Sequence, residues 1–394
     1  MAVSVERLYQ SVKDDDKYEM RCVAGEKGMD KAVNWVHMVE GLAISEFLDG
    51  NEIAFTTGIG MPDDNDALLE LVESIYKNRA SALVINIGPY IKEIPDMVID
   101  FCNYNNFPLF QVPWHVHMAG IMKIFSEILT MADRIDMEIT GAMENAIFFH
   151  DQQSMYIPML EKNGIDCELP YCVALFFIEK LEEKESKRDS VENAIKHIVH
   201  DYSGTNSKES FVFSKRGMMF VIFKNCSYDE IEKNVKSVAD YFVRLGGIYK
   251  DVYCGVGRNT KSVRCLYKSY NLALKAMKLQ IRRNVPREAA VYKKMGVYRT
   301  LMAIDDMEIV KEYYNELFEP LVRYDELNKT SLVEFLKVYF EESGSAVNTA
   351  ERMFLHRNTV NYKIHKIEEI LDCNLSDFDT KVELYIALKL SELI

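Results

Sequence analysis

Between Glu52 and Pro113 the sequence alternates short apolar runs with longer amphipathic stretches. Short uninterrupted apolar runs are typical of strands buried on both faces, and apolar residues three and four apart over longer stretches are typical of helices. The order β-α-β-α-β predicts a parallel sheet covered by helices, which restricts this region to an α/β fold. The predicted strands are EIAFTT, SALVINIG and PLFQVP, with YEMRCVAG and VNWVHMVE upstream, and the predicted helices are DALLELVESIYKNR and PDMVIDFCNYNN.

A Met- and Ile-rich stretch at residues 117–160 predicts a linker helix. Its apolar residues recur at helical spacing, at Ile121, Ile124, Phe125, Ile128, Leu129 and Ile135. Two interpretations fit this pattern equally well. The stretch is either a long amphipathic helix packed on a neighbouring domain or a helix that mediates dimerisation and signalling.

Residues 161–290 predict an α+β domain. The order is a strand, a helix at 190–203, a hairpin with its turn at Lys215 to Gly217, a second helix and a strand, which is a ferredoxin-like order. The pattern then becomes almost wholly helical, and residues 291–394 predict an all-α domain. The expected fold is therefore multidomain, beginning with the α/β domain at residues 1–116.

Composition limits the possible functions. The 394-residue chain has a formal net charge of -14, which argues against a protein that coats nucleic acid or membranes over its whole surface. It has neither a signal-peptide pattern at its start nor an apolar stretch long enough for a membrane span, which predicts a cytoplasmic protein. The eight cysteines show no C-x-x-C pair and no zinc-like spacing, so we expect reduced thiols, no metal and no cofactor.

One segment departs from this acidic character. The sixteen residues from Arg352 to Ile367 contain four Lys or Arg and no acid. Two amphipathic helices are predicted here, Ser345 to Phe354 and Asn358 to Leu371, separated by a short turn as in a helix-turn-helix. The predicted inward residues are Ala346, Ala350, Met353 and Phe354 on the first helix, and Val360, Ile364, Ile367 and Leu371 on the second.

The opposite face of the second helix carries residue types that bind DNA. Asn reads adenine edges, Thr contacts bases or phosphates, and Lys and Arg neutralise phosphates, which makes this the candidate recognition helix. Two other interpretations stay open at this point. Asn358 could serve only as a helix N-cap, and the helices could form an adaptor that binds protein instead of DNA.

The stretch TAERMFLHRNTVNYKIHKIEEI resembles the C-terminal helix-turn-helix of the PucR family of bacterial transcriptional regulators. It matches the family pattern at Thr349, Ala350, His356, Arg357, Asn358, Thr359, Tyr362, Lys363, Lys366 and Ile367. GVGRNTKSVRCLYKSYNLALKAM resembles the end of the GGDEF-like domain of PucR and CdaR regulators. EFLDGNEIAFTTGIGM, SALVINIG and IPDMVIDFCNYNNFPLFQVP are similar to the PucR N-terminal effector domain, so the resemblance covers nearly the whole chain.

This resemblance implies a one-component regulator that senses a metabolite with residues 1–116, dimerises through the linker helix and the middle domain, and binds promoter DNA with its C-terminal domain. Such regulators commonly activate catabolic operons, with purine catabolism favoured here and amino-acid or sugar-acid catabolism as alternatives. The implied partners are double-stranded promoter DNA, a small-molecule effector and at least one further copy of the chain, but no membrane. The implied DNA-contacting residues are His356, Arg357, Asn358, Thr359, Asn361, Tyr362, Lys363 and Lys366.

An effector site is expected at the carboxyl rim of the first sheet, where α/β proteins usually bind ligands. The candidate residues are Thr56, Thr57, Gly58, Asn86, Trp114 and His115. The threonines and nearby backbone N–H groups could cradle an anionic or polar ligand, and Trp114 could stack on a planar ring. The alternative is that Trp114 belongs to the core, and the His-x-His pair it precedes lacks a third metal ligand nearby.

A nucleotide-processing enzyme is the alternative of another class, because true GGDEF domains condense GTP into a cyclic dinucleotide. In this chain the signature carboxylates are replaced by Ser214, Lys215, Arg216 and Gly217. Without those carboxylates Mg²⁺ has no evident ligands, so we expect no enzymatic activity.

Overall fold

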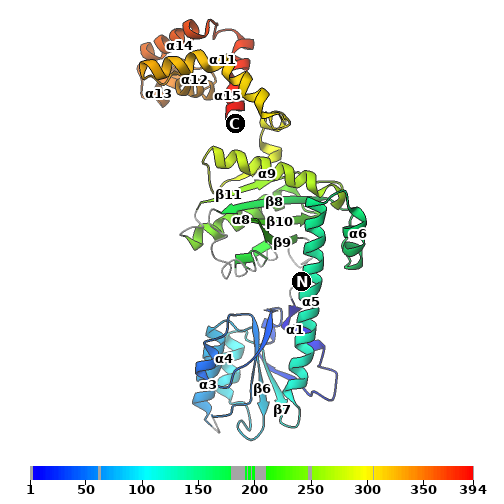
Figure 1. The fold of residues 1–394 in the computed structure, drawn as a ribbon. Helices are drawn as coiled ribbons and strands as arrows, with labels where there is room; N and C mark the ends of the chain where they lie inside the picture. The colour runs from blue at the N-terminus through cyan, green and yellow to red at the C-terminus, as the bar shows by residue number, and fades with distance from the viewer. Residues whose placement is uncertain are drawn as a thin grey trace. The chain divides into compact units, whose positions relative to one another are not determined.

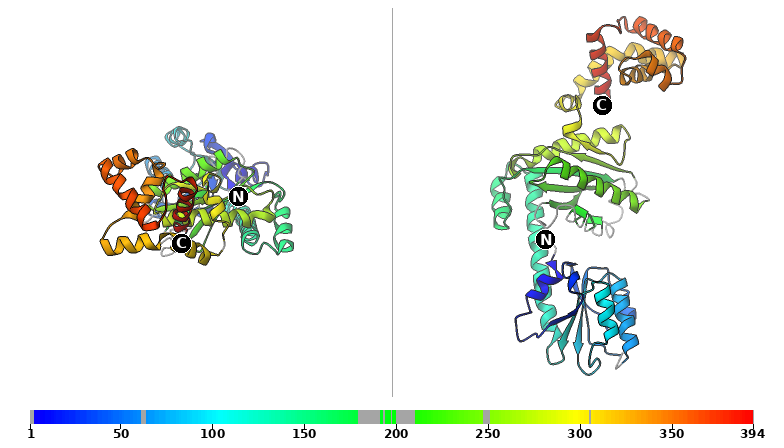
Figure 2. Two further views of the ribbon diagram at one scale, coloured as in Figure 1. Left: turned by 90° about the horizontal axis from the view of Figure 1, so that it is seen from above. Right: turned by 180° about the vertical axis from the view of Figure 1, so that it is seen from behind.

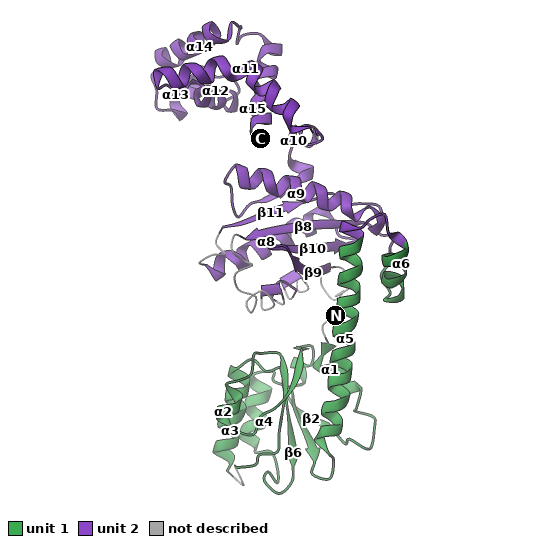
Figure 3. Ribbon diagram, viewed as in Figure 1, with its two compact units in different colours: residues 1–145, 154–166 green, residues 146–153, 167–394 purple. Residues whose placement is uncertain are grey.

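The computed structural model describes residues 3–60, 64–178, 191–192, 194–196, 198–199, 210–246, 251–304 and 306–393. It divides into two compact units (Figure 3). Residues 1–145 and 154–166 form the first unit, and residues 146–153 and 167–394 form the second. Half of the predicted helix at residues 190–203 lies outside the described residues.

The first unit is built on a five-stranded sheet with the order β2-β7-β6-β5-β4. Its strands are β2 (Arg21–Ala24), β4 (Trp35–Met38), β5 (Glu52–Thr56), β6 (Ala82–Ile87) and β7 (Leu109–Pro113). The last four are parallel to one another, whereas β2 pairs antiparallel with β7 at the edge. The strands and helices between Glu52 and Pro113 follow the order predicted from the sequence.

Helices cover both faces of this sheet (Figures 1 and 2). On one face, α3 (Asn65–Lys77) and α4 (Asp96–Tyr104) pack against Leu83 and Ile85. On the other, α1 (Val5–Gln10) and the start of α5 (Met118–Phe148) pack against Val84. Burial on both faces explains why these strands read as continuous apolar runs. Smaller elements of this unit are β1 (Val3–Ser4), β3 (Ala32–Val33) and α2 (Leu42–Ser45).

The predicted linker consists of two helices, α5 and α6 (Gln153–Lys162). Ile121, Phe125 and Leu129 of α5 are buried in the core of the first unit. The helical spacing that predicted a linker therefore serves, in this part, to pack the helix against the sheet. The first turns of α5 belong structurally to the N-terminal domain.

The second unit contains a five-stranded sheet with the order β12-β11-β8-β10-β9. Its strands are β8 (Tyr171–Ile178), β9 (Ser210–Lys215), β10 (Met218–Lys224), β11 (Val252–Val256) and β12 (Ala289–Val291). The predicted hairpin joins β9 to β10 through Arg216 and Gly217, whose φ angles of 51° and 70° suit a two-residue turn. The hairpin and its turn are where the sequence placed them.

Two long helices cover opposite faces of this second sheet. α8 (Tyr228–Leu245) packs on the face that carries Ala174 and Phe176. α9 (Leu266–Arg282) lies so close to the other face that a Cβ on Gly255 would meet the Ala273 carbonyl oxygen at 2.1 Å. Glycine in this strand is therefore required by the approach of the helix.

The C-terminal part of the second unit is helical, as predicted. It contains α11 (Met307–Asn328), α12 (Leu332–Glu341), α13 (Ala346–Arg352), α14 (Arg357–Leu371) and α15 (Phe378–Ser391). These helices share one core, in which Phe318 and Phe335 are fully buried. The same core contains Val360 and Ile367, so it fixes the orientation of α14.

A half-buried carboxylate lies where α9, α10 (Tyr298–Leu301) and the end of α15 meet. Glu392 forms an ion pair with Arg283 (2.7 Å) and accepts hydrogen bonds from Tyr298 (2.6 Å) and Lys389 (3.1 Å). Burial alone would raise the pKa of Glu392, but these hydrogen bonds and the charges of Arg283 and Lys389 lower it overall. Glu392 therefore stays ionised and connects three helices.

Within the described ranges no helix is both long and apolar enough to cross a bilayer. The eight cysteines are free thiols, with Cys102, Cys167, Cys172, Cys226 and Cys254 buried and Cys22, Cys265 and Cys373 half-buried. Among the residues with assigned positions, no group of three or more His, Cys, Asp or Glu is arranged to hold a metal ion.

Candidate nucleic-acid interface

Helices α13 and α14 are joined by four residues, Met353 to His356, in a tight turn. His356 caps α14: its Nδ1 accepts the Asn358 backbone N–H at 3.2 Å. Nδ1 must be unprotonated to accept this bond, so the neutral ring carries its proton on Nε2. The interpretation of Asn358 as the N-cap is therefore wrong, and the side chain of Asn358 is exposed.

One side of α14 holds the helix in the domain. Val360 and Ile367 are fully buried, and Ile364 and Leu371 are half-buried against the same core. All four were predicted to face inward. The first two turns present exposed residues on the other side, namely Arg357, Asn358, Thr359, Asn361 and Tyr362. In the described part of the chain no ion pair holds Arg357, so its guanidinium is available.

The two lysines of the candidate set are placed differently. The Lys363 ammonium lies 5.3 Å from the Phe335 ring centroid, and the Lys366 ammonium lies 5.4 Å from that of Tyr324. Lys366 also pairs with Glu369 at 2.8 Å, and this hydrogen bond raises the pKa of the ammonium. Lys366 is one of the implied DNA-contacting residues, but its side chain is mostly covered, because it lies along the Tyr324 ring. Both charges therefore flank the exposed face.

The prediction that Phe354 faces inward is wrong. α13 ends at Arg352, and Phe354 follows in a left-handed conformation with φ of 53° and 96% of its surface exposed. The residue after it, Leu355, turns back toward the core, and its N–H bonds the Ala350 carbonyl at 2.9 Å. Extending the helical spacing past the real end of the helix placed Phe354 on the wrong side.

Three acids close to the basic run, Glu341, Glu342 and Glu368, already have partners in the structure. Arg352 binds Glu341 at 2.6 Å and Glu342 at 2.8 Å. Glu368 accepts from the Leu375 N–H at 2.9 Å and contacts His365 Nδ1 at 3.0 Å. The exposed start of α14 therefore carries the positive charge of Arg357 without a carboxylate bonded to it. This arrangement suits a polyanion such as nucleic acid.

The predicted effector cradle in the first unit is already filled by a side chain. Thr57 donates to Glu40 from its backbone N–H (3.1 Å) and its hydroxyl (2.8 Å), and the Thr56 hydroxyl donates at 3.2 Å. The Gly58 N–H in turn bonds the Thr56 hydroxyl at 3.2 Å. An anionic ligand would have to displace the Glu40 carboxylate to use these donors, so the idea of an open anion cradle needs correction. Sequence reasoning did not identify Glu40.

The other candidates for the effector site are spread along the same rim. Asn86 is buried and donates to the carbonyls of Val112 and Pro113. Trp114 is 45% exposed and packs edge-on against Tyr90, so the interpretation of Trp114 as a core residue is wrong. His115 bonds Glu19 at 2.7 Å. The rim therefore offers a ligand the exposed indole of Trp114 and the carboxylate of Glu40. The side-chain amide of Asn86 is already bonded to backbone carbonyls of the same unit.

Three family comparisons cover most of the chain. Residues 12–129 match the Purine catabolism regulatory protein-like family, residues 159–279 match the GGDEF-like domain, and residues 332–390 match the PucR C-terminal helix-turn-helix domain. The chain belongs to the PucR family. The match to the PucR C-terminal helix-turn-helix domain includes α12 to α14 and most of α15. It therefore contains the exposed face of α14 described above.

Named relatives point to the same family. The PucR-family chain is 29% identical over 241 residues to the proline-responsive transcriptional activator PutR of Bacillus subtilis, covering 58% of this chain and 56% of PutR. It is 27% identical over 135 residues to the purine catabolism regulatory protein of the same organism, which covers 34% of this chain and 24% of that protein. It is 34% identical over 79 residues to the carbohydrate diacid regulator of Escherichia coli, which covers 20% of each chain. The chain thus spans about half the length of PutR and less of the others.

A regulator of polyketide synthase expression from Bifidobacterium adolescentis is similar among solved structures. The match covers 64% of this chain and 91% of that one at 14% identity, with a TM-score of 0.31. At that score the likeness supports no structural argument.

Proposed function

We propose that this chain is a transcriptional regulator that binds promoter DNA through α14. The observation that carries the proposal is the contrast between the two sides of that helix. Val360 and Ile367 are fully buried, while the opposite side presents Arg357, Asn358 and Thr359 to solvent at the start of the helix. A recognition helix contacts base edges with its N-terminal residues, which is where these side chains lie.

Each exposed residue has a role that fits its chemistry. Arg357 binds guanine or a phosphate, Asn358 and Asn361 read adenine, and Thr359 and Tyr362 bond bases or phosphates. His356 donates its Nε2 proton to a phosphate while Nδ1 caps the helix. Lys363 and Lys366, which lie on the flank, contribute to the attraction for the DNA backbone.

The remaining domains complete the proposal. Residues 1–116 sense a small metabolite, residues 117–160 link and dimerise, residues 161–290 form a ferredoxin-type GGDEF-like domain, and residues 291–394 bind DNA. We propose that the protein activates a catabolic operon. Purine catabolism is the first candidate, and proline or sugar-acid catabolism follows from the names of the relatives. Because Glu40 occupies the donors of the rim, we expect an effector that donates hydrogen bonds to this carboxylate.

The middle domain is proposed to have no enzymatic role. At the hairpin, where a cyclase would carry carboxylates, Lys215 and Arg216 lie over the Phe148 ring at 5.2 and 5.7 Å from its centroid. Two cations at this turn repel Mg²⁺ instead of binding it. Incubation with GTP and Mg²⁺ should yield no cyclic dinucleotide, and product formation would contradict this part of the proposal.

DNA binding can be tested on the full chain with duplexes selected from a random pool. We expect selection to enrich one sequence, and the affinity for it to fall as salt rises, because bound phosphates release counterions. If no duplex binds at low salt, the proposal is wrong. A thermal-shift screen with purines, proline, other amino acids and sugar acids then identifies the effector, since a ligand at 100 times its Kd adds roughly 2.7 kcal/mol of stability.

A further inference from the structure

The turn between α13 and α14 presents an aromatic side chain to solvent. Phe354 is 96% exposed, and its backbone φ of 53° is a left-handed conformation that is unfavourable for a bulky residue. Glycine or asparagine would adopt this conformation at a lower cost, and an exposed ring gains nothing from burial. Strained residues of this kind persist where the surrounding structure holds them, and they concentrate at functional sites.

The residues on either side of Phe354 fix its outward direction. The Phe354 N–H bonds the carbonyl of Glu351 in the last turn of α13 at 3.3 Å. The next residue, Leu355, packs against the core of the helical domain, and its N–H bonds the Ala350 carbonyl at 2.9 Å. Because both backbone N–H groups are bonded to α13, the ring of Phe354 is presented at a defined position.

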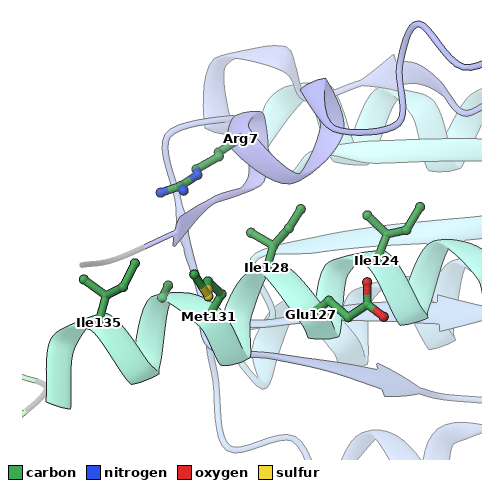
Figure 4. A pocket seen from close by; sticks show the side chains of 7 residues that line it. Arg7, Ile124, Glu127, Ile128, Met131 and Ile135 are labelled. Atoms are coloured by element: carbon green, nitrogen blue, oxygen red, sulfur yellow. The ribbon is translucent and has the colours of Figure 1, made fainter. Parts of the chain in front are cut away.

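Exposed apolar side chains on α5 have a different setting. Figure 4 shows Ile124, Ile128 and Ile135 in a row along that helix, where they line an open groove. Such a row suits an apolar protein surface. The exposed residues that flank Phe354 in the chain are instead polar, namely Glu351, Arg352, His356, Arg357, Asn358 and Thr359. An isolated ring in this polar stretch suits a partner that is mostly polar and carries single apolar groups.

We propose that Phe354 contacts the C5-methyl group of a thymine in the major groove, at the edge of the sequence that α14 reads. The inference rests on the DNA-binding function proposed above and adds one residue and one base to it. The thymine methyl is an apolar group that the major groove displays among hydrogen-bonding base edges, and phenylalanine is one of the residues that contact it. The isolated ring of Phe354 therefore matches the isolated methyl group in chemistry.

The position of the turn supports this contact. Phe354 precedes Arg357 by three residues, so their Cα atoms lie within about 10 Å of each other. Three base-pair steps of DNA span about the same distance. When the start of α14 lies in the major groove, the ring of Phe354 is within a few base pairs of the group that Arg357 binds. The contact favours thymine over cytosine, which has no methyl group.

The main test removes the methyl group from the DNA and the ring from the protein, separately and together. In the duplex selected with the full chain, each thymine is replaced in turn by deoxyuridine, which lacks only that methyl. We expect replacement at one position to weaken binding of the wild type about three- to fivefold, as for the loss of one buried methyl. Phe354→Gly should lose at least as much on the unmodified duplex and should not respond to that replacement. The salt dependence of binding should stay unchanged, because the contact is apolar.

Two further variants separate the ring from the backbone. Phe354→Asn suits the left-handed conformation without the added freedom of glycine, and it should also lose the response to deoxyuridine. Phe378→Ala is the matched control, because Phe378 is 75% exposed in the same domain but lies at the start of α15, beyond the far end of α14. It should change neither the affinity nor the response. Since Phe354→Gly relieves backbone strain, its loss of affinity cannot come from unfolding.

The outcomes separate this contact from DNA binding itself. If the wild type loses no affinity at any thymine, or if Phe354→Gly responds to deoxyuridine as the wild type does, the proposed contact is wrong. If the Phe354 variants bind DNA normally but fail to activate transcription, the ring faces a protein partner, which also overturns the proposal. Affinity that depends on Arg357 but not on Phe354 contradicts only this inference, whereas a wild type that binds no duplex contradicts both proposals.

Discussion

Two regions of this molecule were predicted as recognition sites from similar residue types, and they differ in what their polar groups already bind. At the rim of the first sheet, the hydroxyls of Thr56 and Thr57 and the Thr57 N–H are all bonded to Glu40. At the start of α14, the side chains of Arg357, Asn358 and Thr359 are exposed to solvent. The first region is satisfied internally and the second is open, so a ligand must compete at the rim and need not compete at α14.

The largest expected effect is at the open region. Arg357→Ala should weaken binding to the selected duplex by about 10- to 100-fold, or 1–3 kcal/mol, because an exposed guanidinium loses either a bidentate base contact or a phosphate contact. Salt titration separates the two, since loss of a phosphate contact lowers the slope by roughly one.

Arg352→Ala is the matched control for that variant. Its guanidinium is held by Glu341 and Glu342, so its removal should change the affinity for DNA little. Equal losses from the two arginine variants would remove the distinction between open and occupied groups on which the comparison rests.

The satisfied region is tested by Glu40→Ala. This variant leaves the Thr57 N–H and two hydroxyls without their acceptor, which should lower the free energy of unfolding by about 2 kcal/mol. Excess formate should restore part of the loss by occupying the vacated donors. Denaturant unfolding with and without formate measures both effects. Glu46→Ala, an exposed acid in the same unit, should show neither, and formate should not affect the wild type.

Glu392 extends the comparison to a carboxylate that connects helices. Glu392→Gln should reduce stability at neutral pH by about 1 kcal/mol, because hydrogen bonds and nearby cations favour the ionised form. The folded pKa lies below the ordinary value of 4.5, so this contribution is complete above that value and is lost as pH falls through the folded pKa. Unfolding of both proteins across this range should show the difference shrinking in acid. A pH-independent difference would mean that packing, not charge, is responsible.

The smallest expected effect concerns Phe354. Its φ of 53° is unfavourable for a bulky residue and suits glycine, so Phe354→Gly should raise the free energy of unfolding by about 0.5–1 kcal/mol. Urea unfolding of the full chain measures the change at the transition that includes α14. A loss of stability would indicate that the exposed ring makes contacts that the described structure does not contain.

The sequence predicted where the strands lie in the chain better than it predicted which residues of different strands contact each other. Apolar runs placed β5, β6 and β7 because strands buried on both faces leave a strong pattern. The same pattern contains no information about register, and register is what brings Glu40 to Thr57 across the β4 and β5 pair. The two residues are seventeen positions apart in the chain. A carboxylate that fills a cradle from just beyond the end of a neighbouring strand is therefore found only in the folded structure.

For α13 and α14, the sequence did not show where each helix ends, and this limited the prediction of which side chains face the core. Spacing identified Val360, Ile364, Ile367 and Leu371 as the inward side of α14, because four positions three or four apart fit only one face. It failed at Phe354, which lies beyond the last helical residue of α13. Lys366 also escaped prediction, since a long side chain can leave a polar face and lie against an aromatic ring.

The placement of the cysteines has a practical consequence. Burial raises the pKa of the Cys22 thiol to about 11 and that of the Cys102 and Cys172 thiols to about 12. At neutral pH fewer than about one in a thousand of these groups is a reactive thiolate. A cysteine introduced on the surface would react with maleimides far faster than these three. Fluorophore pairs placed in the first unit and on α14 could then report, by energy transfer, whether the distance between the two changes when an effector is added.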